Sequence, residues 1–99
     1  MDQIERIRQM ELQFDRVIQA VKELSTAIDQ YDEVQEAIKE LKAYYASEEW
    51  RQDYADDEGG RLPEDLKRGV LSEDGIWNML SDAHEVNIRM QETVTKILK

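Results

Sequence analysis

Acidic side chains are the first candidates for chemistry in this sequence, because 23 Asp and Glu stand against 13 Lys and Arg in 99 residues. Half of the net charge of −10 is concentrated in residues 48–58, where Arg51 stands against six acids, namely Glu48, Glu49, Asp53, Asp56, Asp57 and Glu58. Carboxylate oxygens are the ligands that calcium and magnesium prefer. The run lacks the alternating D-x-D-x-D-G spacing of a calcium loop and its terminal Glu, so we predict no metal site and no cofactor.

Acids at helical spacing give a second candidate for chemistry. They are Glu33, Glu36 and Glu40, and Asp82 and Glu85. Facing carboxylates on helices hold magnesium in all-helical nucleotide pyrophosphohydrolases. A metal-dependent hydrolase acting on a phosphorylated small molecule or nucleotide is therefore the alternative function. Because Lys39 and Lys42 flank one group, and a chain this acidic produces such spacings by chance, we favour a solvated, salt-bridged face.

Nucleophilic catalysis has no recognisable residue set. The chain has no Cys and one His, which excludes disulfides, thiolate metal sites and an ordinary zinc site within one chain. His84 is expected half-exposed at the edge of a helix seam, and Ser47 and Ser72 are expected to cap helices. We predict no catalytic residue.

The negative charge also limits the partners. It disfavours binding to nucleic acid phosphates and to anionic membranes. It suits a cationic partner. A third hypothesis is that this protein itself imitates nucleic acid. The N-terminus is charged from Asp2 onward and no segment is apolar enough to span a bilayer, so we expect a soluble cytoplasmic protein.

Rare residue types gather in residues 44–77, here called the connector. This stretch holds the only Pro, all four Gly, both Trp and three of the four Tyr. Its aromatic side chains are expected to form a small second core, or a binding surface where they are exposed. The basic pair Lys67 and Arg68 is expected to bond helix-end carbonyls or nearby carboxylates; the more specific alternative is that it binds an anion. The candidate binding residues are Tyr44, Tyr45, Trp50, Asp53, Tyr54, Asp56, Asp57, Glu58, Lys67, Arg68 and Trp77.

The segment before the connector predicts a long helix over residues 2–30. Its apolar residues form an a/d seam sustained for four heptads, with Ile4 and Ile18 on the flank. The seam consists of Ile7, Phe14, Val21 and Ile28 with Met10, Val17, Leu24 and Tyr31. At 1.5 Å per residue the helix is roughly 42 Å long, so the molecule is expected to be elongated, a dimer, or both.

The apolar phase slips after Tyr31, which predicts a break near residues 29–32 and a second helix over 33–46. Asp32 and Gln35 have the form of a capping box for that helix. Neither Gly nor Pro marks the break, so a single bent helix stays an alternative.

The connector is expected to contain short helices within residues 47–72. Ser47 caps the first of them, and Pro63 starts a turn that stops at Gly69 as a left-handed cap. Ser72 is expected to be the N-cap of a last helix over 73–98.

That last helix repeats the heptad step through Ile76, Ala83, Met90 and Ile97, with Asn87 as a polar register device within the seam. The two long seams are expected to face each other. The prediction is an all-α, elongated helical bundle in a single domain, residues 1–99.

The connector and its flanks resemble a small bacterial family known as domain of unknown function 4298. The resemblance lies in the run YYASEEWRQDYADDEGGRLPEDLKRGVLSED, preceded by MDQIERIRQME, with Asp57 and Gly59 as an extra-acidic and extra-glycine departure. It covers nearly the whole chain and implies a helical bacterial protein. It implies no activity, because the family is uncharacterised.

The preferred function is therefore a non-enzymatic interaction or adaptor module. Its connector would present an acidic and aromatic surface to a protein partner, and the long seams would form a homodimer.

Overall fold

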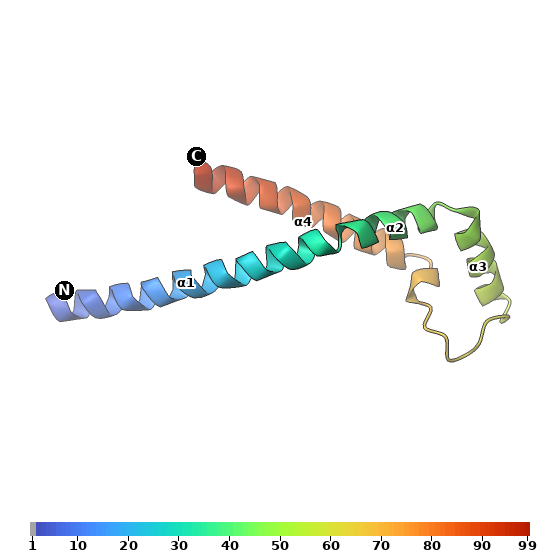
Figure 1. Cartoon of the computed structure of the whole chain (residues 1–99), viewed down its shortest axis with the longest axis horizontal. Helices are drawn as coiled ribbons and strands as arrows, with labels where there is room; N and C mark the ends of the chain where they lie inside the picture. The colour runs from blue at the N-terminus through green and yellow to red at the C-terminus, as the bar shows by residue number, and fades with distance from the viewer. Residues whose placement is uncertain (1) are drawn as a thin grey trace. The chain divides into compact units, whose positions relative to one another are not determined.

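The computed structural model describes residues 2–99 and contains only helices in that range (Figure 1). In chain order they are α1 (Gln3–Glu33), α2 (Gln35–Tyr45), α3 (Glu48–Glu58), the 3-10 helix η1 (Gly69–Leu71) and α4 (Gly75–Leu98). The predicted all-α class is confirmed. Contacts divide the chain into two units, Met1–Glu36 and Ala37–Lys99, which are described separately. The single domain and the packing of the two long seams on each other stay predictions.

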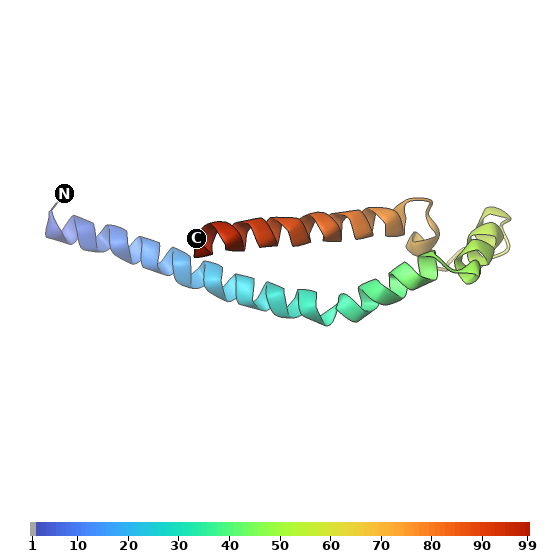
Figure 2. The same cartoon turned by 90° about the horizontal axis from the view of Figure 1, so that it is seen from above.

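The first unit is the helix α1, an unbroken ribbon in Figures 1 and 2. It begins after Asp2, whose Oδ1 accepts a hydrogen bond of 2.8 Å from the Glu5 amide. No Gly or Pro interrupts it, so helical bonding continues through the predicted break at 29–32 and ends at Glu33. The Gln35 side chain donates to the Tyr31 carbonyl at 2.9 Å, so it serves the end of α1 instead of forming the predicted capping box.

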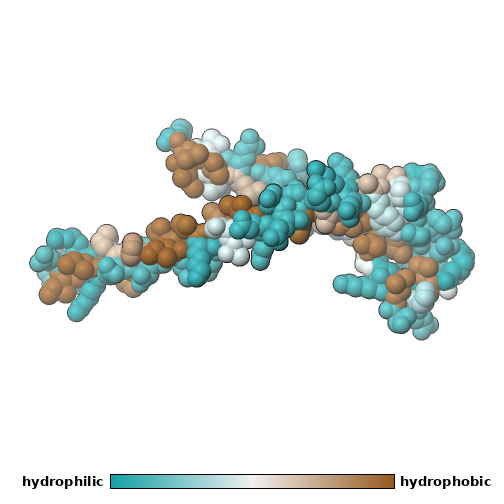
Figure 3. Space-filling model, in the orientation of Figure 1, coloured by the Kyte–Doolittle hydropathy of each residue, from teal (hydrophilic) through white to brown (hydrophobic). Residues whose placement is uncertain are grey.

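Side-chain pairs on its polar face support α1. Arg16 donates to Gln13 Oε1 at 2.9 Å, and Gln19 donates to Glu23 Oε1 at 2.8 Å. Ten large apolar residues of the helix are at least half exposed: Ile4, Ile7, Met10, Leu12, Phe14, Val17, Ile18, Val21, Leu24 and Ile28. Brown, apolar atoms recur along the helix in Figure 3. Its stability therefore comes from local propensity, its cap and these pairs.

The core of the second unit lies where α4 starts. Leu71 in η1 and Ile76 in α4 are 5% and 3% exposed, and they are the buried apolar residues of the described chain. Gly75 lets the first turn of α4 approach η1, because a Cβ there would lie 2.7 Å from the Gly69 carbonyl oxygen. Farther along α4, Leu80 and Ala83 are half-buried, whereas Met90 and Ile97 of the predicted seam and His84 are exposed.

Two predicted caps differ from the structure. The Ser72 hydroxyl donates to the Gly69 carbonyl at 2.8 Å and closes η1, so α4 begins only at Gly75 and has no side-chain cap. Gly69 opens η1 and is not left-handed. Among residues 2–99 only Gly60, after the end of α3, has a positive φ, of 69°. The Ser47 cap is confirmed, since its Oγ accepts from the Trp50 amide at 3.1 Å.

A pair of glycine substitutions tests the turn at Gly60. We expect Gly60→Ala to lower the free energy of unfolding by about 1 kcal/mol, because a Cβ is disfavoured in the left-handed region. Gly69→Ala is the matched control and should be close to neutral, since a Cβ there meets no atom within 4 Å. Denaturant unfolding followed by Trp fluorescence measures both, because Trp50 and Trp77 report on the second unit. Equal effects of the two substitutions would contradict the assignment.

Candidate functional site

The site predicted from the sequence lies in the second unit, where side chains of the connector bond across it. The Tyr44 hydroxyl, at the end of α2, donates a short hydrogen bond of 2.5 Å to Asp53 Oδ2 in α3. Burial and this bond raise the pKa of Tyr44 to about 12, with smaller contributions from the charges of Asp53 and Glu49. Asp53 is therefore an internal acceptor that ties α3 to α2.

Three aromatic rings form the predicted second core of the connector. The ring of Trp50 meets Tyr45 edge-on at 4.9 Å between centroids and stacks on Tyr54 at 5.1 Å. Its indole Nε1 donates to the Val70 carbonyl at 2.9 Å, which joins α3 to η1. The charge of nearby Glu58, ahead of burial, raises the pKa of Tyr54. These contacts tie the connector together, and all three rings are half-buried.

The basic pair Lys67 and Arg68 divides into one structural and one accessible residue. Arg68 Nη1 binds Asp57 Oδ1 at 2.6 Å, and Arg68 Nη2 donates to the carbonyls of Pro63 and Glu64 at 3.0 and 3.1 Å. Arg68 thus braces the loop that follows α3; its carboxylate acceptor agrees with the prediction, whereas its carbonyl acceptors belong to the loop and not to a helix end. Lys67 is exposed, and no side-chain hydrogen bond or ion pair of it is recorded in residues 2–99.

The remaining acids of the predicted acidic edge also have different fates. Asp56 Oδ1 accepts from Arg61 Nε at 2.9 Å and from Gln52 Nε2 at 3.1 Å. Glu58 is exposed and has no recorded side-chain partner in the described chain. The fold therefore uses Asp53, Asp56 and Asp57 as internal acceptors and leaves Glu58 at the surface.

An apolar hollow of about 490 Å³ lies beside this braced loop. Its lining comes from α2, the connector and α4: Leu41, Lys67, Gly69, Val70, Gly75, Ile76 and Met79. Trp77, Leu66 and Val70 are 60%, 47% and 40% exposed in the same connector. Of these exposed and lining residues, sequence reasoning singled out only Lys67 and Trp77 for binding. For Leu66 and Val70, the signal in the sequence was that they flank the basic pair Lys67 and Arg68.

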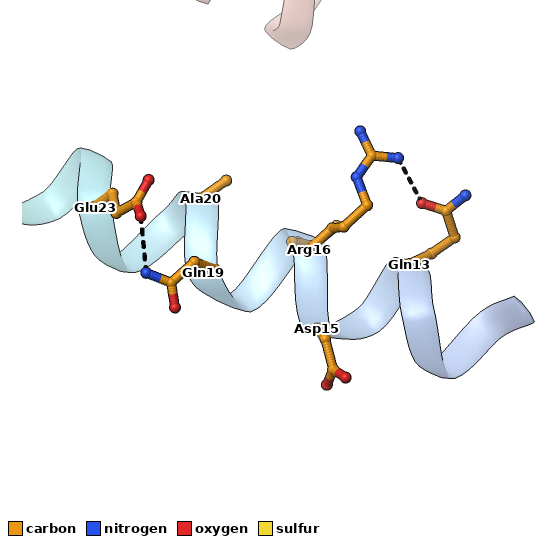
Figure 4. A pocket seen from close by; sticks show the side chains of 7 residues that line it. Gln13, Asp15, Arg16, Gln19, Ala20 and Glu23 are labelled. Carbon is orange, nitrogen blue, oxygen red and sulfur yellow. Dashed lines mark hydrogen bonds between the residues drawn. The ribbon is translucent and has the colours of Figure 1, made fainter. Parts of the chain in front are cut away.

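A second hollow, of about 720 Å³, is not a comparable site, because α1 alone lines it. In Figure 4 the side chains of Arg16 and Asp15 point to opposite sides of the helix, and the two hydrogen bonds drawn run along its surface. One helix cannot enclose a ligand, so this hollow is a stretch of open helix surface.

A family model described as Domain of unknown function (DUF4298) matches residues 7–93. The chain belongs to this family. No curated protein and no solved structure matches it. The match to the DUF4298 family model confirms the resemblance that the connector motif indicated.

The hydrolase alternative for this DUF4298 chain would need a cluster of side chains that binds a metal ion. Among residues 2–99, no three or more His, Asp or Glu side chains lie together as metal ligands would. The hydrolase remains a prediction from the sequence, without a ligand set in the described residues. None of the described helices combines the length and the apolar character that a membrane crossing needs.

The Tyr44–Asp53 bond predicts a pH-dependent contribution to stability. We expect Tyr44→Phe to lower the free energy of unfolding by about 1 kcal/mol at neutral pH, because the substitution removes the part-buried hydrogen bond from the Tyr44 hydroxyl to the Asp53 carboxylate. The folded pKa of about 12 exceeds the unfolded value of 10.0, so the stability that Tyr44 contributes is present below pH 10 and is lost as the pH rises toward 12. Unfolding of wild type and variant from pH 7 to 12 should show the difference shrinking over that window. Tyr45→Phe, which retains the ring contact with Trp50, is the control, and a pH-independent difference would refute the linkage.

Arg68 is expected to be the residue that orders the loop between α3 and η1. Arg68→Ala removes two hydrogen bonds to carbonyls of that loop and one to Asp57 near the end of α3, and we expect it to lower the free energy of unfolding by about 2 kcal/mol. Amide hydrogen exchange should accelerate in residues 60–68. The control is Arg51→Ala, which breaks only the exposed pair with Glu48 and should change stability by less than about 0.5 kcal/mol. Unchanged exchange in residues 60–68 would show that other contacts order the loop.

Proposed function

We propose that this chain is a non-enzymatic protein–protein interaction module, an adaptor whose connector binds a protein partner. One observation carries the proposal: large apolar side chains stay exposed in and after a loop that is braced by internal hydrogen bonds. Leu66 in the loop, Val70 in η1 and Trp77 in α4 are exposed, and Val70 also lines the apolar hollow. A loop that is already ordered loses less conformational entropy on binding.

Trp77 is the expected anchor of this surface. It is 60% exposed, although Trp is usually covered in a folded chain, and Trp is among the residues that contribute most to interfaces. Trp50, in contrast, is committed to Tyr45, Tyr54 and the Val70 carbonyl. The contrast supports a functional role for one Trp and a structural role for the other.

The charge around the connector indicates the chemistry of the partner. The connector also carries exposed acids for which no side-chain partner is recorded in residues 2–99: Glu58, Glu64, Asp65, Glu73 and Asp74. The surface therefore suits a protein patch with an apolar centre and a cationic rim, which opposite charge would steer into place. Lys67 would accept one acidic group near the centre. We place this interaction in the bacterial cytoplasm, with neither nucleic acid nor a membrane as the partner.

Capture of proteins from the native cell tests the proposal. We expect Trp77→Ala to weaken a specific capture by about 30-fold, the loss typical of a central Trp, because the anchor is removed. The matched control is Ile97→Ala, which truncates a 71% exposed residue outside the connector. Circular dichroism melting should be the same for both variants and wild type. Equal capture by Trp77→Ala and wild type would exclude the connector as the binding surface.

A further inference from the structure

We propose that α1 binds the α1 helix of a second copy of this chain as a parallel, two-stranded coiled coil. The proposal concerns α1 alone and goes beyond the connector function, from which it is independent. Its starting point is that α1 is 31 residues long and contains no buried residue.

The exposed area is large enough for a stable dimer. Nine large apolar residues lie on the a/d seam or its flank, and each is at least half exposed: Ile4, Ile7, Met10, Phe14, Val17, Ile18, Val21, Leu24 and Ile28. At roughly 80 Å² of exposed area each, two copies would bury roughly 1,400 Å², within the range of specific protein interfaces.

The residues of the seam select the number of strands. The a positions carry β-branched Ile7, Val21 and Ile28, and one d position carries Leu24. β-branched residues at a with Leu at d favour parallel two-stranded coiled coils over trimers and tetramers. The bulky Phe14 at the remaining a position would pair with its own copy near the middle of the seam.

The charged residues select the orientation. Arg6 is at a g position and Glu11 at the following e position, both exposed, and neither has a recorded side-chain partner in residues 2–99. In a parallel pair, g of one helix faces the next e of the other, so Arg6 and Glu11 would form two symmetric ion pairs. In an antiparallel pair with full overlap, g faces g, and Arg6 would meet the neutral Ala27. The parallel arrangement is the one with complementary charge.

Charge reversal tests the pairing through the dimer dissociation constant, measured by sedimentation of the full chain. Wild type should be a dimer. Arg6→Glu and Glu11→Arg should each raise the dissociation constant by about tenfold, because two attractive pairs become repulsive. An equimolar mixture of the two variants should restore wild-type affinity, since every facing pair is then opposite in charge. A strict monomer at high concentration, a trimer or tetramer, or no recovery in the mixture would overturn the proposal.

Cross-linking tests orientation without relying on charge, because the chain has no native Cys. Met10→Cys at a d position should form a disulfide-linked dimer on mild oxidation, since equal d positions face each other in a parallel coiled coil. Leu12→Cys at f, on the outer face, is the control and should not. An antiparallel dimer in the register that pairs Arg6 with Ala27 would place the two positions 10 roughly 20 Å apart along the helix axis, so absence of the cross-link in a dimer would also overturn the proposal.

The two proposals fail separately. Trp77→Ala should leave the sedimentation behaviour unchanged, and the charge reversals should leave the folded connector unchanged by Trp fluorescence. Loss of dimerisation in Trp77→Ala would overturn the assignment of the dimer interface to α1.

Discussion

The contacts of Trp50 are the constraint on which the second unit most depends. Its indole ring lies between Tyr45 and Tyr54, and its Nε1 bonds the Val70 carbonyl twenty residues ahead in the chain. This one side chain joins the end of α2, the body of α3 and the start of η1. Since only Leu71 and Ile76 are fully buried among the described residues, apolar burial alone supplies little stability here. The aromatic cluster and the directional hydrogen bonds of the connector make up the difference.

The braced connector also explains how an acidic loop stays ordered. Adjacent carboxylates repel one another, and a loop of this composition has little apolar area of its own. The repulsion is offset residue by residue, through Tyr44 on Asp53, Arg61 on Asp56 and Arg68 on Asp57. Glu58 and other acids of the connector stay exposed in the same segment as Leu66, Val70 and Trp77, and the proposed protein interaction rests on this combination.

The helix α1 presents the opposite situation, because it is ordered by local forces and has an apolar face that the described chain does not bury. Such a face is uncommon on a protein that works alone. In the two proposals, the seam of α1 binds a second copy of the chain and the connector binds a different protein. A dimer would present two connectors, and paired sites raise the effective concentration of a bivalent partner.

Sequence alone predicted what depends on neighbouring residues. The long helices, the Ser47 cap and the family motif all follow from residues a few positions apart, and the structure and the family match agree with them. The role of each connector residue could not be predicted in this way, because it depends on contacts between residues nine to twenty positions apart. Asp53 and Glu58 are both acids of the same segment, yet Asp53 is an internal acceptor and Glu58 is exposed without a recorded partner. Trp50 is half-buried in contacts with two tyrosine rings, whereas Trp77 is exposed. Gly60, not Gly69, takes the left-handed turn, and Ser72 closes η1 instead of opening α4. The helices were therefore determined by local spacing, and only the tertiary contacts decided which polar and aromatic groups remain available for a partner.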